Sequence, residues 1–251
     1  MRNLKLIIEY DGGHFSGFQV QPKGKTVQGE IEKAIFKLTG EKVRITGSGR
    51  TDSGVHALYQ VVNFKTRSKL DPRDIKRALN SLLSNIVIKD IEKASMSFDA
   101  RRKAKKREYV YLVYSGATLP VFLIGRVCHV KGKLDLGRIR KISKILLGKH
   151  DFSSFCVKDK SEKSCLRELK RIEIGRRSID LLGDRHRVIY LRFVANGFLW
   201  KMIRFIVGTM LKVGQGRMSA AEVKRILASK DNRNAGPVAP AQGLYLTRVW
   251  Y

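Results

Sequence analysis

Apolar and polar residues alternate along this chain with two different periods, one typical of strands and one typical of helices. Segments with the one period are interleaved with segments with the other along the whole sequence. A period of two, or a short run of branched and aromatic residues, is typical of a β-strand. The predicted strands span residues 4–10, 43–47, 58–64, 86–91, 109–114, 187–194 and 244–249.

Helices are predicted where apolar residues return every three or four positions and capping residues bound the run. Thr26 and Gly40 bound the first of these runs, and Asp71 followed by Pro72 begins the second. Ser219 and Glu222 have the spacing of a capping box. The predicted helices span residues 27–39, 72–83, 135–147 and 199–213, with a short helix beginning at 220.

Strands interleaved with helices in each half favour an α+β fold, in which helices pack on one face of a largely antiparallel sheet. The two halves resemble each other only in this pattern, because no exact repeat links them. We expect a boundary near the basic run at residue 101, with one α+β half at 1–100 and a second at 101–251.

The net charge of the chain indicates what kind of molecule it binds. Its 251 residues include 51 Lys and Arg against 22 Asp and Glu, which gives a formal net charge of +29. A polyanionic partner is the commonest reason for a compact protein to carry so much charge of one sign, so we expect nucleic acid.

Other classes of protein are disfavoured by what the sequence lacks. No apolar run approaches the roughly 20 residues that cross a bilayer, and the first residues carry no secretory signal. Three scattered cysteines, Cys128, Cys156 and Cys165, form no disulfide framework, which predicts a reducing, cytoplasmic setting. The scattered histidines and the absence of a C-x-x-C pair predict no metal site.

The most unusual segment is a glycine-framed loop at 47–56, which reads Gly-Ser-Gly-Arg-Thr-Asp-Ser-Gly-Val-His. Its glycines lack the spacing of a dinucleotide fingerprint, and an acid at position 52 would repel pyrophosphate. The loop presents Arg50 and Asp52 together. From the residues alone, Asp52 is either a turn cap beside a surface arginine or a nucleophile or general base that nearby cations keep ionised.

A cationic run precedes the strand predicted at 109–114. Six of the seven residues from 101 to 107 are basic, namely Arg101, Arg102, Lys103, Lys105, Lys106 and Arg107. Strand alternation places Tyr109 and Tyr111 on one face and Tyr114 on the other. Phosphate contacts by the cations and base stacking by Tyr109 suit RNA recognition; the alternative is that the tyrosines only pack the sheet.

Arg204 lies within an otherwise apolar predicted helix. Burying an unpaired cation is costly, so an inward-facing Arg204 needs a carboxylate partner, for which Asp52 is a candidate. In the alternative arrangement Arg204 lies at the helix surface near Lys201, three residues earlier.

These residues resemble a known family. The segment 47–57 is similar to the G-x-G-R-T-D-x-G-V-H-A signature of the tRNA pseudouridine synthases of the A class, and further matching segments follow the family's order along the chain. They lie at 10–12, 15–19, 26–29, 79–80, 98–101, 109–111, 150–155, 201–204 and 239–244. Departures occur at Phe18, Ser84, Asp99 and Phe205, where tryptophan, proline, histidine and asparagine are more usual.

The resemblance implies an enzyme that converts uridine to pseudouridine in the tRNA anticodon stem-loop, typically at tRNA positions 38, 39 and 40. It implies no cofactor and no required metal, and a homodimer whose RNA-binding clefts use both subunits. Each subunit is expected to have two α+β halves whose sheets join across a central cleft. Asp52 is then the nucleophile, Tyr109 stacks on the target base, Arg204 pairs with Asp52, and Arg50 contacts the substrate.

Two other functions fit parts of the sequence. A non-catalytic RNA-binding or RNA-chaperone protein could use the same basic surface, and it predicts that Asp52 matters only slightly, for stability. A nuclease assisted by its cations predicts cleavage of the RNA chain.

Overall fold

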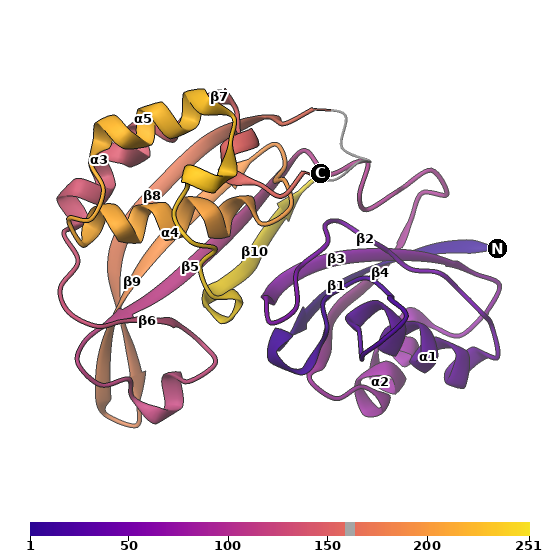
Figure 1. Ribbon diagram of the computed structural model, residues 1–251. Helices are drawn as coiled ribbons and strands as arrows, with labels where there is room; N and C mark the ends of the chain where they lie inside the picture. The colour runs from indigo at the N-terminus through magenta and orange to yellow at the C-terminus, as the bar shows by residue number, and fades with distance from the viewer. Residues whose placement is uncertain (159–163) are drawn as a thin grey trace. The chain divides into compact units, whose positions relative to one another are not determined.

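The computed structural model describes residues 1–158 and 164–251, and it divides the chain into two compact units (Figure 1). The first unit consists of Met1–Arg107 and Tyr245–Tyr251, and the second of Glu108–Leu244. This division differs from the expected halves at 1–100 and 101–251. The cationic run belongs to the first unit, and the last strand returns to it because Tyr245 and Leu246 pair with His56 and Ala57.

The first unit has a sheet in the order β4-β1-β3-β10. Its strands are β1 (Arg2–Tyr10), β2 (Thr46–Gly47), β3 (His56–Thr66), β4 (Ile86–Ala94) and β10 (Leu244–Trp250). β1 runs antiparallel to both β3 and β4, β2 pairs with β3, and β10 is parallel to β3. The strand expected at 43–47 is limited to its last two residues.

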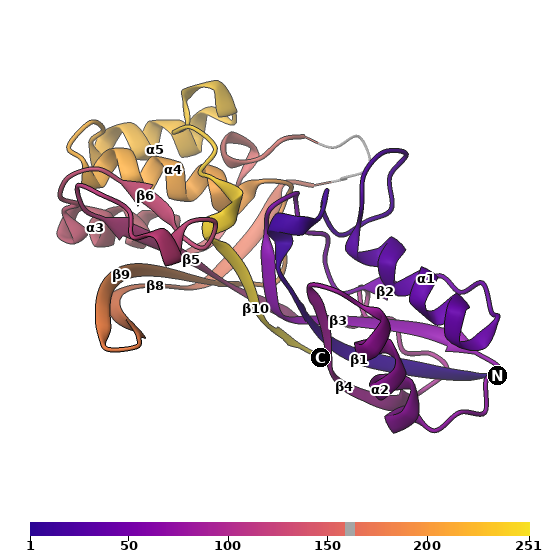
Figure 2. The same ribbon diagram turned by 90° about the horizontal axis from the view of Figure 1, so that it is seen from below.

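Two helices lie against one face of this sheet, α1 (Val27–Thr39) and α2 (Pro72–Leu82) (Figures 1 and 2). Their predicted caps are confirmed. The Thr26 hydroxyl accepts from the amide of Gly29, Gly40 ends α1 in the left-handed region at φ 71°, and Asp71 caps α2 ahead of Pro72. Buried residues of both helices and of the strands form the core, namely Leu4, Leu6, Ile8, Ile31, Ile35, Val61, Phe64, Ile75, Leu79 and Ile88.

The second unit has strands in the order β5-β9-β8-β7, with β6 added parallel to β5. They are β5 (Lys106–Ser115), β6 (Cys128–Val130), β7 (Gly148–Asp151), β8 (Leu166–Leu181) and β9 (Asp184–Ala195). β8 and β9 form a long antiparallel hairpin. β8 was not predicted, because pairs of basic residues at 170–171 and 176–177 interrupt its apolar alternation.

Three helices, α3 (Leu136–Leu146), α4 (Met202–Gly214) and α5 (Ala220–Ser229), cover one face of this sheet (Figures 1 and 2). The predicted capping box of α5 is present. Helix α4 begins three residues later than expected, because Lys201 before it has a left-handed conformation at φ 60°. It continues through Gly214, where a Cβ would lie 2.8 Å from Ile139 Cδ1, so this glycine allows α3 and α4 to approach closely.

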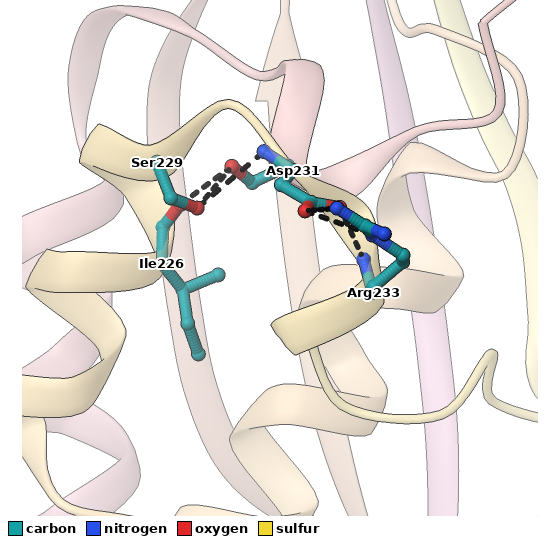
Figure 3. Close-up of polar contacts among 5 residues, drawn as sticks. Ile226, Ser229, Asp231 and Arg233 are labelled. Atoms are coloured by element: carbon teal, nitrogen blue, oxygen red, sulfur yellow. Dashed lines mark hydrogen bonds and ion pairs between the residues drawn. The ribbon is translucent and has the colours of Figure 1, made fainter.

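Short 3-10 helices complete the structure: η1 (Gly12–His14), η2 (Val121–Leu123), η3 (Ser153–Phe155), η4 (Asn232–Asn234) and η5 (Ala241–Gly243). Figure 3 shows how the chain leaves α5 for η4. The hydroxyl of Ser229 donates to Ile226 O, while Arg233 binds the carboxylate of Asp231 through Nε at 2.9 Å. Hydrogen bonding by Arg233 lowers the pKa of Asp231 to about 2.

Both units therefore have the predicted α+β architecture, with largely antiparallel strands and helices on one face. Within residues 1–158 and 164–251, no helix is long and apolar enough to cross a membrane.

Candidate active site

The glycine-framed segment Gly47–His56, here called the Asp52 loop, connects β2 to β3 in the first unit. Its second residue, Ser48, and its ninth, Val55, are buried, whereas Arg50 is exposed and Asp52 is half-buried. A turn closes at its far end, where the amide of Val55 donates to Asp52 O at 3.2 Å and Gly54 has φ +79°. The loop therefore has buried ends, while Arg50 between them is exposed to solvent.

Residues 10–18 of the N-terminal segment bind this loop through hydrogen bonds. Tyr10 Oη and Thr51 Oγ1 form a buried hydrogen bond of 2.8 Å, directly before Asp52. The amide of Phe18 donates to Thr51 O at 3.1 Å. On the other side of Asp52, the Ser53 hydroxyl donates to Phe15 O at 3.2 Å. Asp52 therefore lies between two residues that are each fixed to the segment 10–18.

Two glycines make this close packing possible. A Cβ on Gly12 would lie 2.0 Å from Val55 O, and a Cβ on Gly47 would lie 2.4 Å from the ring of Phe18. Phe18, one of the departures from the family pattern, is buried here against Gly47. Gly12 is thus explained by close approach to the backbone at Val55, and Gly47 by contact with the ring of Phe18.

We expect Gly12→Ala to lower the free energy of unfolding by about 1–3 kcal/mol, the usual cost of overpacking, because its methyl group would collide with the backbone at Val55. Urea denaturation measures this loss. Gly13→Ala is the matched control, since its Cβ would meet only the Asp11 carboxylate, at 3.3 Å. An equal effect of the two substitutions would contradict the assigned contact.

The second unit carries the other two predicted site residues, Tyr109 and Arg204. Tyr109 lies on β5 with its ring edge-to-face against Phe198, the centroids 5.2 Å apart. Tyr109, Tyr111 and Val113 are all buried on one face of the strand, as the alternation predicted. Tyr114 is on the other face, packed against the small cluster formed by Leu123, Val127 and Val188.

Arg204 lies in the first turn of α4 and is half-buried. Its Nε donates to Ala239 O at 2.7 Å, while the amide of Ala239 donates to Arg204 O at 3.0 Å. Tyr111 reaches the next residue of the same segment, since its hydroxyl donates to Pro240 O at 2.8 Å. Burial raises the pKa of Tyr111 above its ordinary value. The segment that leads to β10 is thus fixed to α4 and to β5.

The residues of the cationic run differ in their exposure to solvent. Arg101, Arg102, Lys103 and Lys105 are exposed, and the carboxylate of Asp99 accepts from the backbone amides of the first two. The two residues that follow are half-buried. Lys106 places its ammonium 5.3 Å from the centroid of the Trp250 ring. Arg107 donates to Ser48 O.

The predicted site residues thus fall into two groups. Arg50, Asp52 and the cationic run belong to the first unit, and Tyr109 and Arg204 belong to the second. The ion pair between Asp52 and Arg204 stays a prediction. Among the residues that the structure describes, no group of three or more His, Cys, Asp or Glu side chains could hold a metal ion.

Sequence reasoning gave no loop-supporting role to Tyr10, Gln60 or Arg107. Their side chains bind Thr51 Oγ1, Gly49 O and Ser48 O, and no spacing rule connects these positions. The matched segments at 10–12 and 15–19 were the available signal, because they now prove to lie against the loop.

Known proteins are similar to this chain over its full length. A family model described as tRNA pseudouridine synthase matches residues 6–101 and 142–251. A tRNA pseudouridine synthase A of Caldicellulosiruptor saccharolyticus is 45% identical, with 100% of both chains covered. Proteins of the same name from Acetivibrio thermocellus and Geobacillus kaustophilus are each 42% identical over 100% of this chain, covering 100% and 95% of those relatives.

Solved structures resemble the chain more distantly. It aligns over 97% of its length with 49% of a chain in the crystal structure of a Cbf5-Nop10-Gar1 complex, at 13% identity and a TM-score of 0.37, which is too low to identify a shared fold. The sequence relatives and the family match are sufficient: this chain belongs to the tRNA pseudouridine synthase family.

Proposed function

We propose that this protein converts uridine to pseudouridine in the anticodon stem-loop of tRNA, at tRNA positions 38, 39 and 40, with Asp52 as the nucleophile. One observation carries the assignment of Asp52. The residues on both sides of it are anchored by hydrogen bonds to the segment 10–18, in a member of a family of RNA-modifying enzymes. A carboxylate held in this way is preorganised to meet a substrate atom.

The reaction is an isomerisation, so its atoms balance without a co-reactant. The bond between N1 of uracil and C1′ of ribose breaks, a bond between C5 and C1′ forms, the C5 proton leaves and N1 gains a proton. Asp52 can hold the reaction together by attack on C6 of the base or on C1′ of the ribose. In both routes the carboxylate of Asp52 acts as the nucleophile.

The target nucleotide must leave the base stack before Asp52 can reach it, which costs about a few kcal/mol. An aromatic side chain that stacks on the flipped base offsets about 1–3 kcal/mol of this cost, and we assign that role to Tyr109. Arg204 is proposed to pair with Asp52 and to help hold the flipped nucleotide. Arg50, exposed two residues before Asp52, is proposed to contact the substrate.

The exposed cations Arg101, Arg102, Lys103 and Lys105 are proposed to bind RNA phosphates, a role the sequence also gave to Lys106 and Arg107. Because tRNA is the substrate, we place the enzyme in the cytoplasm. No cofactor and no metal ion enter the proposed reaction.

The function is tested by incubating an unmodified tRNA transcript with the protein and digesting the RNA to nucleosides. We expect pseudouridine to replace uridine in RNA of full length. Shortened RNA would instead support a nuclease. Tight, salt-sensitive binding with no new nucleoside would support an RNA-binding or RNA-chaperone protein.

We further propose that the enzyme is a homodimer, and that the turn at η2 lies in the dimer interface. Val121, Phe122 and Ile124 are 67%, 77% and 61% exposed. No charged residue occurs from Tyr109 to Gly125, in a chain of net charge +29. Two strongly cationic copies approach most easily through such an uncharged, apolar surface.

Phe122→Asp is therefore expected to convert the dimer to a folded monomer, because it places a charge in an apolar interface. Sedimentation velocity measures the change in mass. The matched control is Phe36→Asp on α1, where a phenylalanine is 47% exposed in the other unit. A wild-type monomer, or dimers of both variants, would contradict this interface.

A further inference from the structure

Arg107 is the last residue of the cationic run, and its side chain binds backbone carbonyls of the protein. Nε and Nη2 both donate to a single acceptor, Ser48 O, the former at 2.9 Å, and Nη2 also donates to Arg101 O at 3.1 Å. The residue is half-buried, whereas Arg101, Arg102, Lys103 and Lys105 are exposed. A guanidinium whose donors are occupied in this way has less capacity left for a phosphate.

The acceptor lies in the Asp52 loop, four residues before Asp52. Ser48 is completely buried, and its amide donates to Val61 O at 2.8 Å. The next carbonyl, Gly49 O, accepts from Gln60 Nε2 at 2.8 Å, and the Ser48 hydroxyl donates to Gln60 Oε1 at 2.5 Å. Gln60 is itself completely buried. Two consecutive carbonyls of the loop are thus held by the side chains of Arg107 and Gln60.

These contacts fix the start of the loop, as the contacts of Thr51, Ser53 and Val55 fix its far side. A peptide held at Ser48 and Gly49 and again at Thr51 leaves only Arg50 between its fixed points. Loss of the Arg107 guanidinium removes the side-chain donors to the buried Ser48 carbonyl. The flexible Gly49 that follows then lets this peptide turn, and Asp52 shifts with it. A displacement of about 1 Å at a reacting group can cost on the order of 100-fold in rate.

We propose that Arg107 is a positioning residue for Asp52, which acts through the Ser48 carbonyl and not through an RNA phosphate. This inference rests on the proposed function, since it needs Asp52 to be the nucleophile. It gives Arg107 a role different from that of its neighbours in the same run, and it gives the same role to Gln60, which holds the next carbonyl, Gly49 O.

The test compares Arg107→Met and Arg107→Lys with Arg102→Met, an exposed cation of the same run. Each variant is assayed for kcat, for the affinity for tRNA, and for the slope of log affinity against log salt. We expect Arg107→Met to lower kcat by about 10- to 100-fold and to leave the slope unchanged. Arg102→Met is expected to reduce the slope by about 0.7–0.9, as removal of one phosphate contact does.

Arg107→Lys separates the two roles even if Arg107→Met is too unstable to assay. Lysine is a good phosphate ligand. Its ammonium group lacks the rigid guanidinium fork with which arginine donates two N–H groups to one carbonyl. We expect it to keep the salt slope and to lose part of the kcat. Gln60→Met provides a second variant, because a fully buried residue cannot contact RNA; it should lower kcat without a change in slope.

The inference is overturned if Arg107→Met reduces the salt slope as Arg102→Met does while kcat stays at the wild-type value, or if Arg107→Lys restores full kcat. Asp52→Ala is measured in the same assay to keep the two proposals apart. An inactive Asp52→Ala together with a fully active Arg107→Met removes only the role of Arg107. An active Asp52→Ala removes the proposed nucleophile, and the positioning role with it.

Discussion

Asp52→Ala is expected to lower the rate of pseudouridine formation by on the order of 10⁴-fold or more, the scale of losing a nucleophile. The substitution removes the carboxylate that forms the covalent bond to the substrate in the proposed reaction. Release of tritium from tRNA labelled at C5 of uridine measures the rate, because the C5–H bond is broken in every turnover. Affinity for tRNA should change little, since the phosphate contacts remain.

The matched control is Asp71→Ala, which removes the carboxylate that caps α2 in the same unit. It is expected to cost about 1 kcal/mol of stability and to leave the rate unchanged. Asp52→Asn should be as inactive as Asp52→Ala, because the amide keeps the shape of the side chain without its charge. Full activity of either Asp52 variant would show that Asp52 is only a turn residue.

Tyr109→Ala is expected to slow turnover by about 5- to 150-fold, the equivalent of the 1–3 kcal/mol that one stacked base contributes. The affinity for tRNA should fall much less, because the stack forms only with the flipped nucleotide. Single-turnover rates and equilibrium binding separate the two effects. Tyr109→Phe should retain most of the rate, since the ring remains.

Tyr111→Ala is the comparison on the same face of β5. Its ring is completely buried and its hydroxyl binds Pro240 O, so its loss should act chiefly on the free energy of unfolding. Equal effects of Tyr109→Ala and Tyr111→Ala on turnover would contradict a stacking role that belongs to Tyr109 alone.

The helix ends were the most predictable part of the fold. Thr26, Gly40, Asp71 and Ser219 act within four residues of their own positions, so their roles can be seen in the local sequence. The strands were predictable where one face is buried, as in β1 and β5. β8 was missed because its charged residues lie in pairs and hide the alternation.

The domain boundary depended on contacts that no local pattern contains. β10 is the last strand of the chain, yet Tyr245 pairs with His56, nearly two hundred residues earlier. The boundary was expected near the cationic run at residue 101, but the last residues of the run, Lys106 and Arg107, are the start of β5. The first segment of the first unit ends at Arg107, so the boundary follows the cationic run and does not precede it.

Some residues of the candidate site could be predicted from the sequence, but their contacts could not. Asp52 stood out because three glycines surround it within eight residues, and the structure gives two of the nearby glycines a steric reason, at Gly47 and Gly12. The assignment of Arg107 to the RNA backbone followed from its neighbours alone. The acceptor that Arg107 has within the protein, Ser48 O, is a backbone atom 59 positions away, which sequence patterns do not report.

The most direct test of the central claim maps the product. An unmodified tRNA transcript is incubated with wild-type protein or with Asp52→Ala, treated with carbodiimide to block pseudouridine, and read by primer extension. The proposed function predicts a new stop in the anticodon stem-loop with the wild-type protein and none with Asp52→Ala. The same stop with both proteins would contradict the assignment of Asp52, and no stop with either would contradict the isomerase itself.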